Sequence, residues 1–402
     1  MNNLYVVKYG GTSVGSIEKI KGVAERLAAR KSKGDNLVVV VSAMGNTTNA
    51  LVDMAKSVSP EPCHRDMDML LSTGEQVSIA LLSMAINTLG LESVSYTGPQ
   101  AGIITDNSHT RARISEVDND KISSALETGK IVIIAGFQGV TEDGEITTLG
   151  RGGSDTTAVC LAASLNCPCE IYTDVDGVYA IDPRVYPEAK KLASLCYDEM
   201  LEMASLGATV LETRAVELAS KFGVPLTVAL STGEYPGTLI KERDAEMEKR
   251  VVTGLTIEED CLMVSLNRIP FASKNITEIF ARLAGNNVFV DMISQTAPYN
   301  SFVNVSFSTY ESTKHKVKEI VQGLKSDYPT LDYLIDASVI KLSVVGIGMV
   351  SQSGVAADLF KVFSDNNIDF YQVTTSEISI SYTIDANDRD KAVEAIAQHF
   401  DL

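Results

Sequence analysis

The chain has 402 residues, of which 45% are hydrophobic and 21% charged, a composition typical of a soluble globular protein. At roughly 100–200 residues per domain, this length predicts two to four domains. The formal net charge is −18, and an acidic chain without a basic run is a poor candidate for binding nucleic acid. No stretch reaches the ~20 apolar residues that span a bilayer, and the N-terminus does not read as a signal peptide, so we expect no membrane insertion and a cytoplasmic location.

Cysteine and histidine give no sign of a metal site. The six cysteines form no C-x-x-C pair, and the four histidines stand apart from one another along the chain. We therefore expect free thiols in a reducing compartment and no structural zinc.

Residues 1 to about 230 alternate between strand and helix patterns. Leu4–Val7 is a short apolar run that ends at paired glycines, and Leu37–Val41 is nearly all β-branched, as in a strand buried on both faces of a parallel sheet. Ser16 is placed to cap a helix between them. The apolar positions of that helix are Ile20, Val23, Ala24 and Leu27. Further strands are predicted at 93–96, 130–135, 170–173 and 226–229, and helices at 73–89, 111–128 and 154–166.

This alternation predicts a mainly parallel sheet covered by helices, with ligands at the carboxyl ends of the strands. A charged stretch with little apolar pattern follows and predicts a linker. The expected domains are residues 1–235, a linker at 236–255, and two smaller units at 256–335 and 336–402.

The C-terminal part contains an internal repeat. Phe280–Val288 matches Phe360–Ile368, with a pair of asparagines at the same positions in both copies. Each copy predicts the order strand, helix, strand, strand, helix, which is a small α+β unit used twice. The alternative is that both halves converged independently on an Asn turn at a helix end.

The first of three candidate functional segments is Lys8–Gly15, which follows a strand and opens onto a helix. Paired glycines let backbone N–H groups approach an anion at such a place. The glycine spacing is close to that of a Walker A loop, but Ser16 stands where that motif needs lysine. The segment predicts a different phosphate-binding loop with Lys8 as its cation; the alternative is a glycine-rich turn with a solvated lysine.

The second segment, Thr148–Asp155, also opens a helix. Arg151 lies between glycines, where its guanidinium can present two N–H donors to a carboxylate or phosphate. The alternative is that Ser154 or Asp155 merely caps the helix. The third segment, Tyr172–Arg184, is an acidic turn after a strand and predicts a nucleotide-holding loop or, alternatively, a surface turn. No G-x-G-x-x-G follows a strand, so dinucleotide binding is not expected.

Taken in order, these segments resemble the aspartate kinases. The resemblance rests on KYGGTSVG at 8–15, SAMGNTTN at 42–49, STGEQ at 72–76, TLGRGGSDTTA at 148–158 and YTDVDGVYAIDPR at 172–184. In the repeat, VDMISQ at 290–295, VVGIGMVSQSGVAADLF at 344–360 and TTSEISIS at 374–381 are similar to the paired ACT domains of that family. The resemblance implies an α/β amino-acid-kinase sandwich followed by two α+β, ferredoxin-like ACT domains.

The implied reaction is ATP- and Mg²⁺-dependent phosphorylation of the side-chain carboxylate of L-aspartate to 4-phospho-L-aspartate. In the family this is the first step toward lysine, threonine and methionine. The resemblance also implies inhibition by lysine, threonine or both at the ACT domains, and a homodimer or tetramer formed through those domains. Two other functions remain open: a kinase for another amino-acid carboxylate, and a non-catalytic amino-acid sensor.

The resemblance assigns roles to individual residues. Lys8 is the catalytic cation and Asp155 orients it. The residues assigned to ATP are Lys8, Gly10, Gly11, Ser13, Thr173, Asp174, Tyr179, Asp182 and Arg184. Those assigned to aspartate are Thr48, Glu75, Arg151, Gly152 and Ser154, and those assigned to the effector are Asp291, Met292 and Gln295. No protein metal ligand is implied, because ATP itself carries most of the Mg²⁺ contacts.

The chain departs from the family pattern in one region. A lysine that usually approaches the nucleotide is replaced by Thr209, and a second basic residue is replaced by Ala229. The ATP contacts expected on that side of the site are therefore not defined by the sequence.

Overall fold

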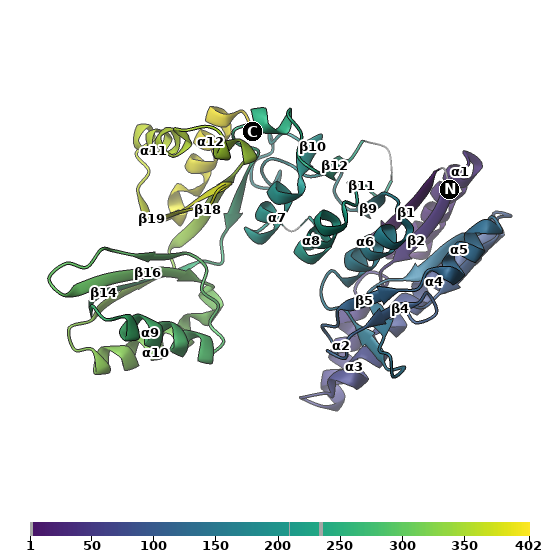
Figure 1. The fold of residues 1–402 in the computed structure, drawn as a ribbon, viewed down its shortest axis with the longest axis horizontal. Helices are drawn as coiled ribbons and strands as arrows, with labels where there is room; N and C mark the ends of the chain where they lie inside the picture. Colours follow the sequence, from purple (N-terminus) through teal and green to yellow (C-terminus); the bar gives the residue numbers. More distant parts are fainter. Residues whose placement is uncertain (1–2, 209, 233–235) are drawn as a thin grey trace. The chain divides into compact units, whose positions relative to one another are not determined.

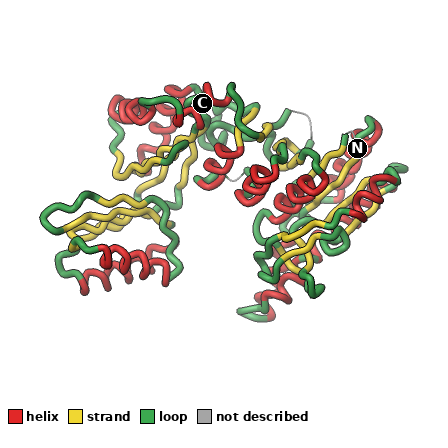
Figure 2. The backbone as a smooth tube through the Cα atoms, viewed as in Figure 1, coloured by secondary structure: helices red, strands yellow, loops and turns green. Residues whose placement is uncertain are grey.

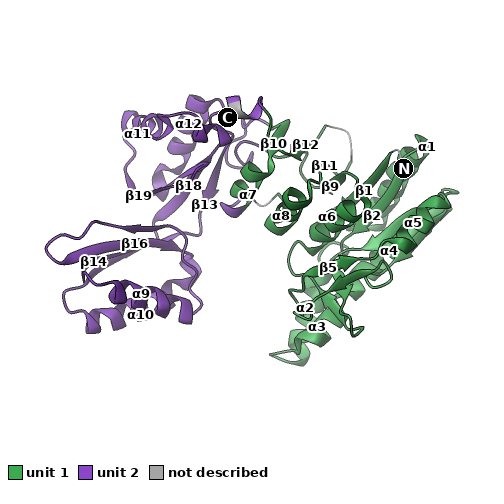
Figure 3. Cartoon of the chain, viewed as in Figure 1, with its two compact units in different colours: residues 1–178, 191–204, 209–244 green, residues 179–190, 205–208, 245–402 purple. Residues whose placement is uncertain are grey.

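The computed structural model describes residues 3–208, 210–232 and 236–402, so Thr209 lies outside the described residues. The chain divides into two compact units, drawn in two colours in Figure 3. Unit 1 comprises residues 1–178, 191–204 and 209–244, and unit 2 comprises residues 179–190, 205–208 and 245–402.

Unit 1 is built on an eight-stranded sheet in the order β10-β12-β11-β9-β1-β2-β6-β3 (Figure 1). All neighbouring strands are parallel except β11 and β12, which confirms the predicted α/β fold. The strands are β1 (Leu4–Tyr9), β2 (Asn36–Val41), β3 (Ser93–Tyr96), β6 (Ile131–Ala135), β9 (Cys169–Thr173), β10 (Ser194–Cys196), β11 (Leu226–Leu230) and β12 (Thr238–Lys241).

Helices flank this sheet, and a second, smaller sheet in the order β5-β4-β7-β8 lies in the same unit (Figure 2). The helices are α1 (Ile17–Ser32), α2 (Thr47–Val58), α3 (His64–Leu71), α4 (Thr73–Thr88), α5 (Asp120–Glu127), α6 (Gly153–Leu165), α7 (Tyr197–Ser205) and α8 (Thr213–Phe222). The strands of the smaller sheet are β4 (Ile103–Thr105), β5 (Ile114–Val117), β7 (Gln138–Val140) and β8 (Ile146–Thr148).

Strand alternation decides which side chains reach the site. Successive residues of a strand point to opposite faces. Val7 and Tyr9 of β1 pack in one core cluster with residues of α1 and α4, so Lys8 between them points to the opposite face, toward α6. Helix α1 begins as predicted: the side chain of Ser16 accepts a hydrogen bond from the Lys19 amide.

Two predictions were wrong in detail. The predicted helix 111–128 is a strand, β5, followed by the short α5, because Ile103 of β4 lies opposite Val117 and draws this segment into the smaller sheet. The predicted linker 236–255 contains β12, whose Thr238 and Ile240 are fully buried against the main sheet. The sequence analysis missed this short strand because charged residues follow it directly.

Unit 2 contains two four-stranded antiparallel sheets, in the orders β15-β16-β14-β17 and β13-β18-β20-β19. The strands are β13 (Gly254–Glu258), β14 (Leu262–Pro270), β15 (Ile293–Gln295), β16 (Phe302–Thr309), β17 (Asp332–Asp336), β18 (Val339–Val345), β19 (Phe370–Thr375) and β20 (Ser379–Asp385). The helices are α9 (Ser273–Gly285), α10 (Lys314–Asp327), α11 (Val355–Asp365) and α12 (Arg389–Phe400). Since β13 precedes the first repeat but pairs with β18 of the second, the second α+β unit is discontinuous in sequence.

The repeat is visible in the backbone. The second asparagine of each pair is left-handed, with φ of 55° at Asn287 and 49° at Asn367. The next residue then donates to the same helical carbonyl in both copies, Val288 to Leu283 at 3.0 Å and Ile368 to Phe363 at 2.9 Å. Asparagine tolerates this conformation better than most residues, which explains why it occurs in both copies.

One helical stretch among the described residues, His64–Thr88, is long and apolar enough to cross a membrane by length and composition. It consists of α3, which packs against α2 and β8, and α4, which packs against α1, β3 and β6. It also carries two buried carboxylates, Asp68 and Glu75. We interpret it as a core helix of unit 1.

Candidate active site

A cavity of about 260 Å³ lies at the carboxyl ends of β1 and β2 in unit 1. It is lined by the starts of three helices, with Thr48 in the first turn of α2, Glu75 in that of α4 and Ser154 in that of α6. Helix N-termini carry unpaired N–H groups and positive partial charge, so they favour anions. The lining residues are Lys8, Gly11, Ser42, Ala43, Gly45, Thr48, Glu75, Phe137, Gly150, Arg151, Gly152, Gly153, Ser154 and Asp155.

The cation of this cavity is fixed by an ion pair. The Lys8 ammonium lies 2.6 Å from a carboxylate oxygen of Asp155, and each side chain is 11% exposed. The N-cap residue of α6 is Gly152, and no side chain forms a capping hydrogen bond there. Lys8 is therefore not the solvated lysine of the alternative interpretation, and Asp155 does not serve as a helix cap.

Two glycines allow the backbone to close around this ion pair. A Cβ on Gly11 would lie 2.8 Å from the carbonyl oxygen of Ala43, and one on Gly152 would lie 2.4 Å from the side chain of Glu212. Gly152 also has φ of 61°, a conformation that other residues rarely adopt. Arg151 lies just before it, exposed on the rim of the cavity.

Glu75 presents a carboxylate oxygen that no described residue satisfies. One oxygen accepts a hydrogen bond from the Ala43 amide at 3.0 Å, while the other is buried without a partner among the described residues. Burial raises the pKa of Glu75 to about 7, against the smaller opposing effect of the Ala43 bond. Such a group suits a cationic ligand, because an unpaired buried carboxylate is costly.

The residues assigned to ATP are only partly brought together. Lys8 and Gly11 line the cavity, and the Gly10 amide donates to Tyr172 on the neighbouring strand β9 at 3.2 Å. Thr173 and Asp174 follow at the end of that strand, joined by a hydrogen bond of 3.0 Å.

The other residues assigned to ATP lie outside this cavity lining. The Ser13 hydroxyl is buried without a hydrogen-bond partner among the described residues. Tyr179, Asp182 and Arg184 belong to unit 2, where the Arg184 guanidinium pairs with the Asp182 carboxylate at 2.6 Å and lowers its pKa.

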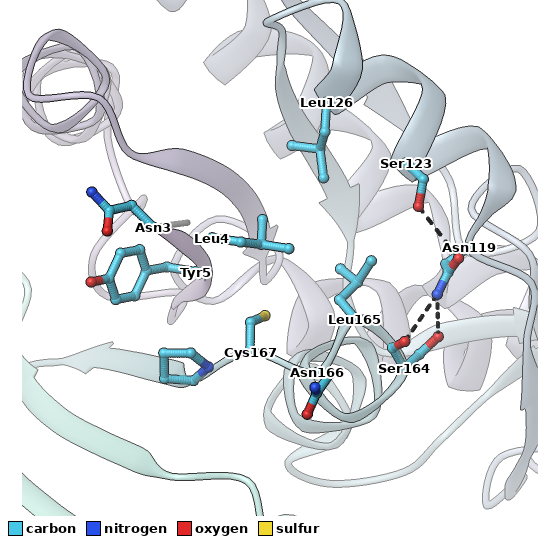
Figure 4. A pocket seen from close by; sticks show the side chains of 11 residues that line it. Asn3, Leu4, Tyr5, Asn119, Ser123, Leu126, Ser164, Leu165, Asn166 and Cys167 are labelled. Atoms are coloured by element: carbon cyan, nitrogen blue, oxygen red, sulfur yellow. Dashed lines mark hydrogen bonds between the residues drawn. The ribbon is translucent and has the colours of Figure 1, made fainter. Parts of the chain in front are cut away.

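A larger cavity of about 590 Å³ lies elsewhere in unit 1, near the start of β1 and the end of α6. Its lining includes Asn119, Ser164 and Asn166, and it carries no charged side chain (Figure 4). It therefore offers nothing to neutralise phosphate, so volume alone does not locate the active site.

Sequence reasoning missed two acidic residues near the site. Glu212, beside Gly152, has a raised pKa, mainly through burial and then through the nearby Asp155 carboxylate. Asp68 is fully buried and pairs with His109, so that histidine does not stand alone. No spacing in the sequence links residues 68 and 109, and only the fold reveals the pair.

The three residues assigned to the effector do not share one cavity in this chain. Asp291 lines a cavity of about 210 Å³ in unit 2 and forms an ion pair with Lys341. The side chain of Met292 is buried, and Gln295 lines a different cavity beside Phe271 and Phe280. Asp291 therefore lines a cavity formed by a single chain. Gln295 instead lies on β15, a strand at the edge of its sheet.

Comparison with known proteins gives a consistent result. Residues 3–229 match the amino acid kinase family, and residues 342–400 match an ACT domain family. Aspartokinase 2 of Bacillus subtilis is 48% identical over 99% of this chain and 98% of its own.

Among solved structures, Escherichia coli aspartokinase III matches over 99% of both chains at 22% identity. Its complex with lysine and aspartate has a TM-score of 0.81, and its complex with aspartate and ADP has one of 0.77. The chain therefore belongs to the aspartate kinases, the amino acid kinases that carry C-terminal ACT domains.

Proposed function

We propose that this aspartate kinase holds aspartate between Glu75 and Arg151 and uses Lys8 to neutralise the transferring phosphoryl group. The observation that carries this proposal is the charge arrangement of the 260 Å³ cavity, which places Lys8, Arg151, Glu75 and Asp155 around one space. Aspartate offers an ammonium group for Glu75, an α-carboxylate for Arg151, and a second carboxylate as acceptor.

The reaction needs no general base. The acceptor carboxylate has an ordinary pKa near 3.9, so it is ionised at neutral pH. An oxygen of this carboxylate forms a bond to the γ-phosphorus of ATP while the bond from that phosphorus to the bridging oxygen breaks, and ADP leaves. Catalysis of this step is mainly positioning and charge neutralisation. Lys8, the amides near Gly10 and Gly11 and the helix starts supply both.

Asp155 fixes the direction of the Lys8 ammonium, and Thr48, Gly152 and Ser154 complete the aspartate side of the cavity. The nucleotide side comprises Ser13, Thr173 and Asp174, and by resemblance Tyr179, Asp182 and Arg184. Mg²⁺ suits a donor set of phosphate oxygens with one or two carboxylates. Asp155, whose carboxylate lies beside Lys8 in the cavity, would be the carboxylate for this ion. When bound, Mg²⁺ would supply further neutralisation of the phosphate charge.

The test is formation of an acyl phosphate, trapped with hydroxylamine, in the presence of ATP, Mg²⁺ and L-aspartate. We expect product with aspartate and little with glutamate or N-acetylglutamate. Product with another acceptor but not with aspartate would favour the second kinase interpretation. No product with any carboxylate would favour the sensor interpretation.

Glu75 makes the binding of aspartate pH-dependent. Below about pH 7 the carboxyl of the free enzyme is mostly protonated and cannot pair with an ammonium group, whereas above it the carboxylate can. We therefore expect kcat/KM for aspartate to rise as pH increases through about 7. Glu75→Gln should flatten this rise and increase the KM for aspartate, as measured by initial rates across that range.

Glu212→Gln is the matched control for the pH profile, because burial raises the pKa of that carboxyl too, although it is absent from the cavity lining. If the rise persists in Glu75→Gln and disappears in Glu212→Gln, the assignment of the ammonium contact to Glu75 is wrong.

We also propose that the cavity beside Asp291 takes a feedback inhibitor, and that lysine is that inhibitor. Its lining carries three carboxylates, from Glu258, Asp260 and Asp291, against the single ammonium of Lys341. This excess of negative charge favours an amino acid with a cationic side chain over threonine. Met292 and Gln295 are then expected to act where two chains meet, since β15 is an edge strand with Ile293 half exposed.

A homodimer or tetramer formed through the ACT domains is therefore part of the proposal. Light scattering with and without lysine tests it.

The six cysteines are free in the structure, which suits the cytoplasmic location that we propose.

A further inference from the structure

Asp68 is a buried carboxylate outside the reaction described above. Its side chain is 0% exposed and does not line the 260 Å³ cavity. Three donors surround it. The Thr110 amide lies 3.0 Å from both oxygens, Nδ1 of His109 lies 2.8 Å from one, and the Thr148 hydroxyl lies 2.5 Å from the other.

One of these donors, Thr148, is close in sequence to the residues proposed to bind aspartate. Thr148 is the last residue of β8, and Gly150 and Arg151 follow it. Its carbonyl accepts a hydrogen bond from the Ala112 amide at 2.9 Å. The Arg214 guanidinium in turn bridges the carbonyls of Ala112 and Leu149 at 3.0 and 3.3 Å. The chain entering Arg151 is thus held through Thr148 on one side and through Leu149 on the other.

Asp68 is also connected to the other substrate contact. Helix α3, which carries Asp68, is followed after Ser72 by α4, which carries Glu75 about two turns further on. The residue between the two helices is held in place by a hydrogen bond, because the Gln138 side-chain amide donates to the Ser72 carbonyl at 2.9 Å. Asp68 therefore connects the helix pair that carries Glu75 to β8, the strand that precedes Arg151.

We propose that Asp68, supported by His109, is a positioning residue that sets the spacing between Glu75 and Arg151 and thereby the fit of aspartate. The proposal rests on the proposed roles of those two residues. A purely structural role would lower stability, and with it the amount of active enzyme, without changing the KM for one substrate alone. A positioning role raises the KM for aspartate and leaves the KM for ATP unchanged, because small displacements at a binding site carry large effects.

The sharpest test changes one hydroxyl. Thr148→Val removes the donor to Asp68 while keeping the size and the β-branching of the side chain. We expect the KM for aspartate to rise roughly tenfold, the loss of a hydrogen bond to a charged group, with less than about a twofold change in the KM for ATP. Thr147→Val is the matched control, because this adjacent, fully buried residue pairs with Thr105 at 2.6 Å and not with Asp68. Equal effects of the two variants on both substrates would overturn the proposal.

Two further variants separate positioning from folding. Asp68→Asn should raise the KM for aspartate at least as much as Thr148→Val. The NH₂ group of the asparagine would face groups that donate hydrogen bonds to the Asp68 carboxylate. His109→Asn keeps an N–H near the place of Nδ1 and should retain aspartate affinity, whereas His109→Leu should lose it. If His109→Leu keeps the aspartate affinity of the unaltered enzyme, His109 has no part in the positioning.

The outcome also distinguishes this inference from the proposed function. If Arg151→Lys and Glu75→Gln raise the KM for aspartate but Thr148→Val and Asp68→Asn do not, only the positioning role fails. If Arg151→Lys and Glu75→Gln leave that KM unchanged, the assigned aspartate site is itself wrong. Thermal denaturation of each variant shows whether the measured enzyme is folded.

Discussion

Replacing Lys8 by alanine should abolish turnover while the fold of unit 1 persists. Lys8 is the cation at the end of β1 that faces Asp155 at 2.6 Å within the cavity. Removing one preorganised electrostatic contact to a developing charge commonly costs about 10²–10³ in kcat. We expect at least that loss, measured as acyl phosphate formed per minute at saturating aspartate and ATP, with circular dichroism unchanged.

The alanine variant also leaves the Asp155 carboxylate without its cation in a nearly closed site, which is destabilising. The double variant Lys8→Met with Asp155→Asn removes both charges and keeps the packing, so it should be folded and equally inactive. Lys31→Ala is the matched control, since its ammonium on α1 contacts Asn36 and does not line the cavity. Normal kcat in a folded Lys8→Ala protein would refute the role of Lys8.

Local pattern predicted six of the eight strands of the main sheet, together with helices α1, α4 and α6. The β-branched run 37–41 and the helix capped by Ser16 were predicted because their signals lie within a few residues. The prediction of a helix at 111–128 was wrong because β5 forms only through its pairing with β4. The prediction of a linker at 236–255 missed β12 for the same reason, because this strand is defined by its pairing with β11 and β10 rather than by its own sequence.

The candidate site divides in the same way. Lys8, Arg151 and Asp155 lie in glycine-rich segments, so the sequence predicted them, and the parallel sheet brings them to one cavity. Asp68 and Glu212 have no local motif and are placed by contacts far along the chain. The family resemblance assigned Gln295 to the effector together with Asp291, but in the structure Gln295 on β15 lines a different cavity.

Replacing Asp291 by alanine should remove feedback by lysine with little change in the uninhibited rate. Asp291 lines the acidic cavity of unit 2 and is 38% exposed, so a ligand can reach its carboxylate. An allosteric coupling is typically about 5–150-fold in affinity. We therefore expect the half-inhibitory lysine concentration to rise about tenfold or more, measured by hydroxylamine trapping over a lysine series.

The partner of Asp291 complicates the single variant and also sharpens the test. The Lys341 side chain is 6% exposed, so Asp291→Ala leaves a buried ammonium without its carboxylate, at a cost in stability. Asp291→Ala with Lys341→Met removes both charges and should also lose inhibition, which separates ligand binding from instability. Asp369→Ala changes an exposed acid of the second repeat near Tyr371, the residue that matches Asp291, and should be inhibited normally. Unchanged inhibition in both Asp291 variants would mean that lysine binds elsewhere, because no carboxylate would remain at that position to hold its ammonium group.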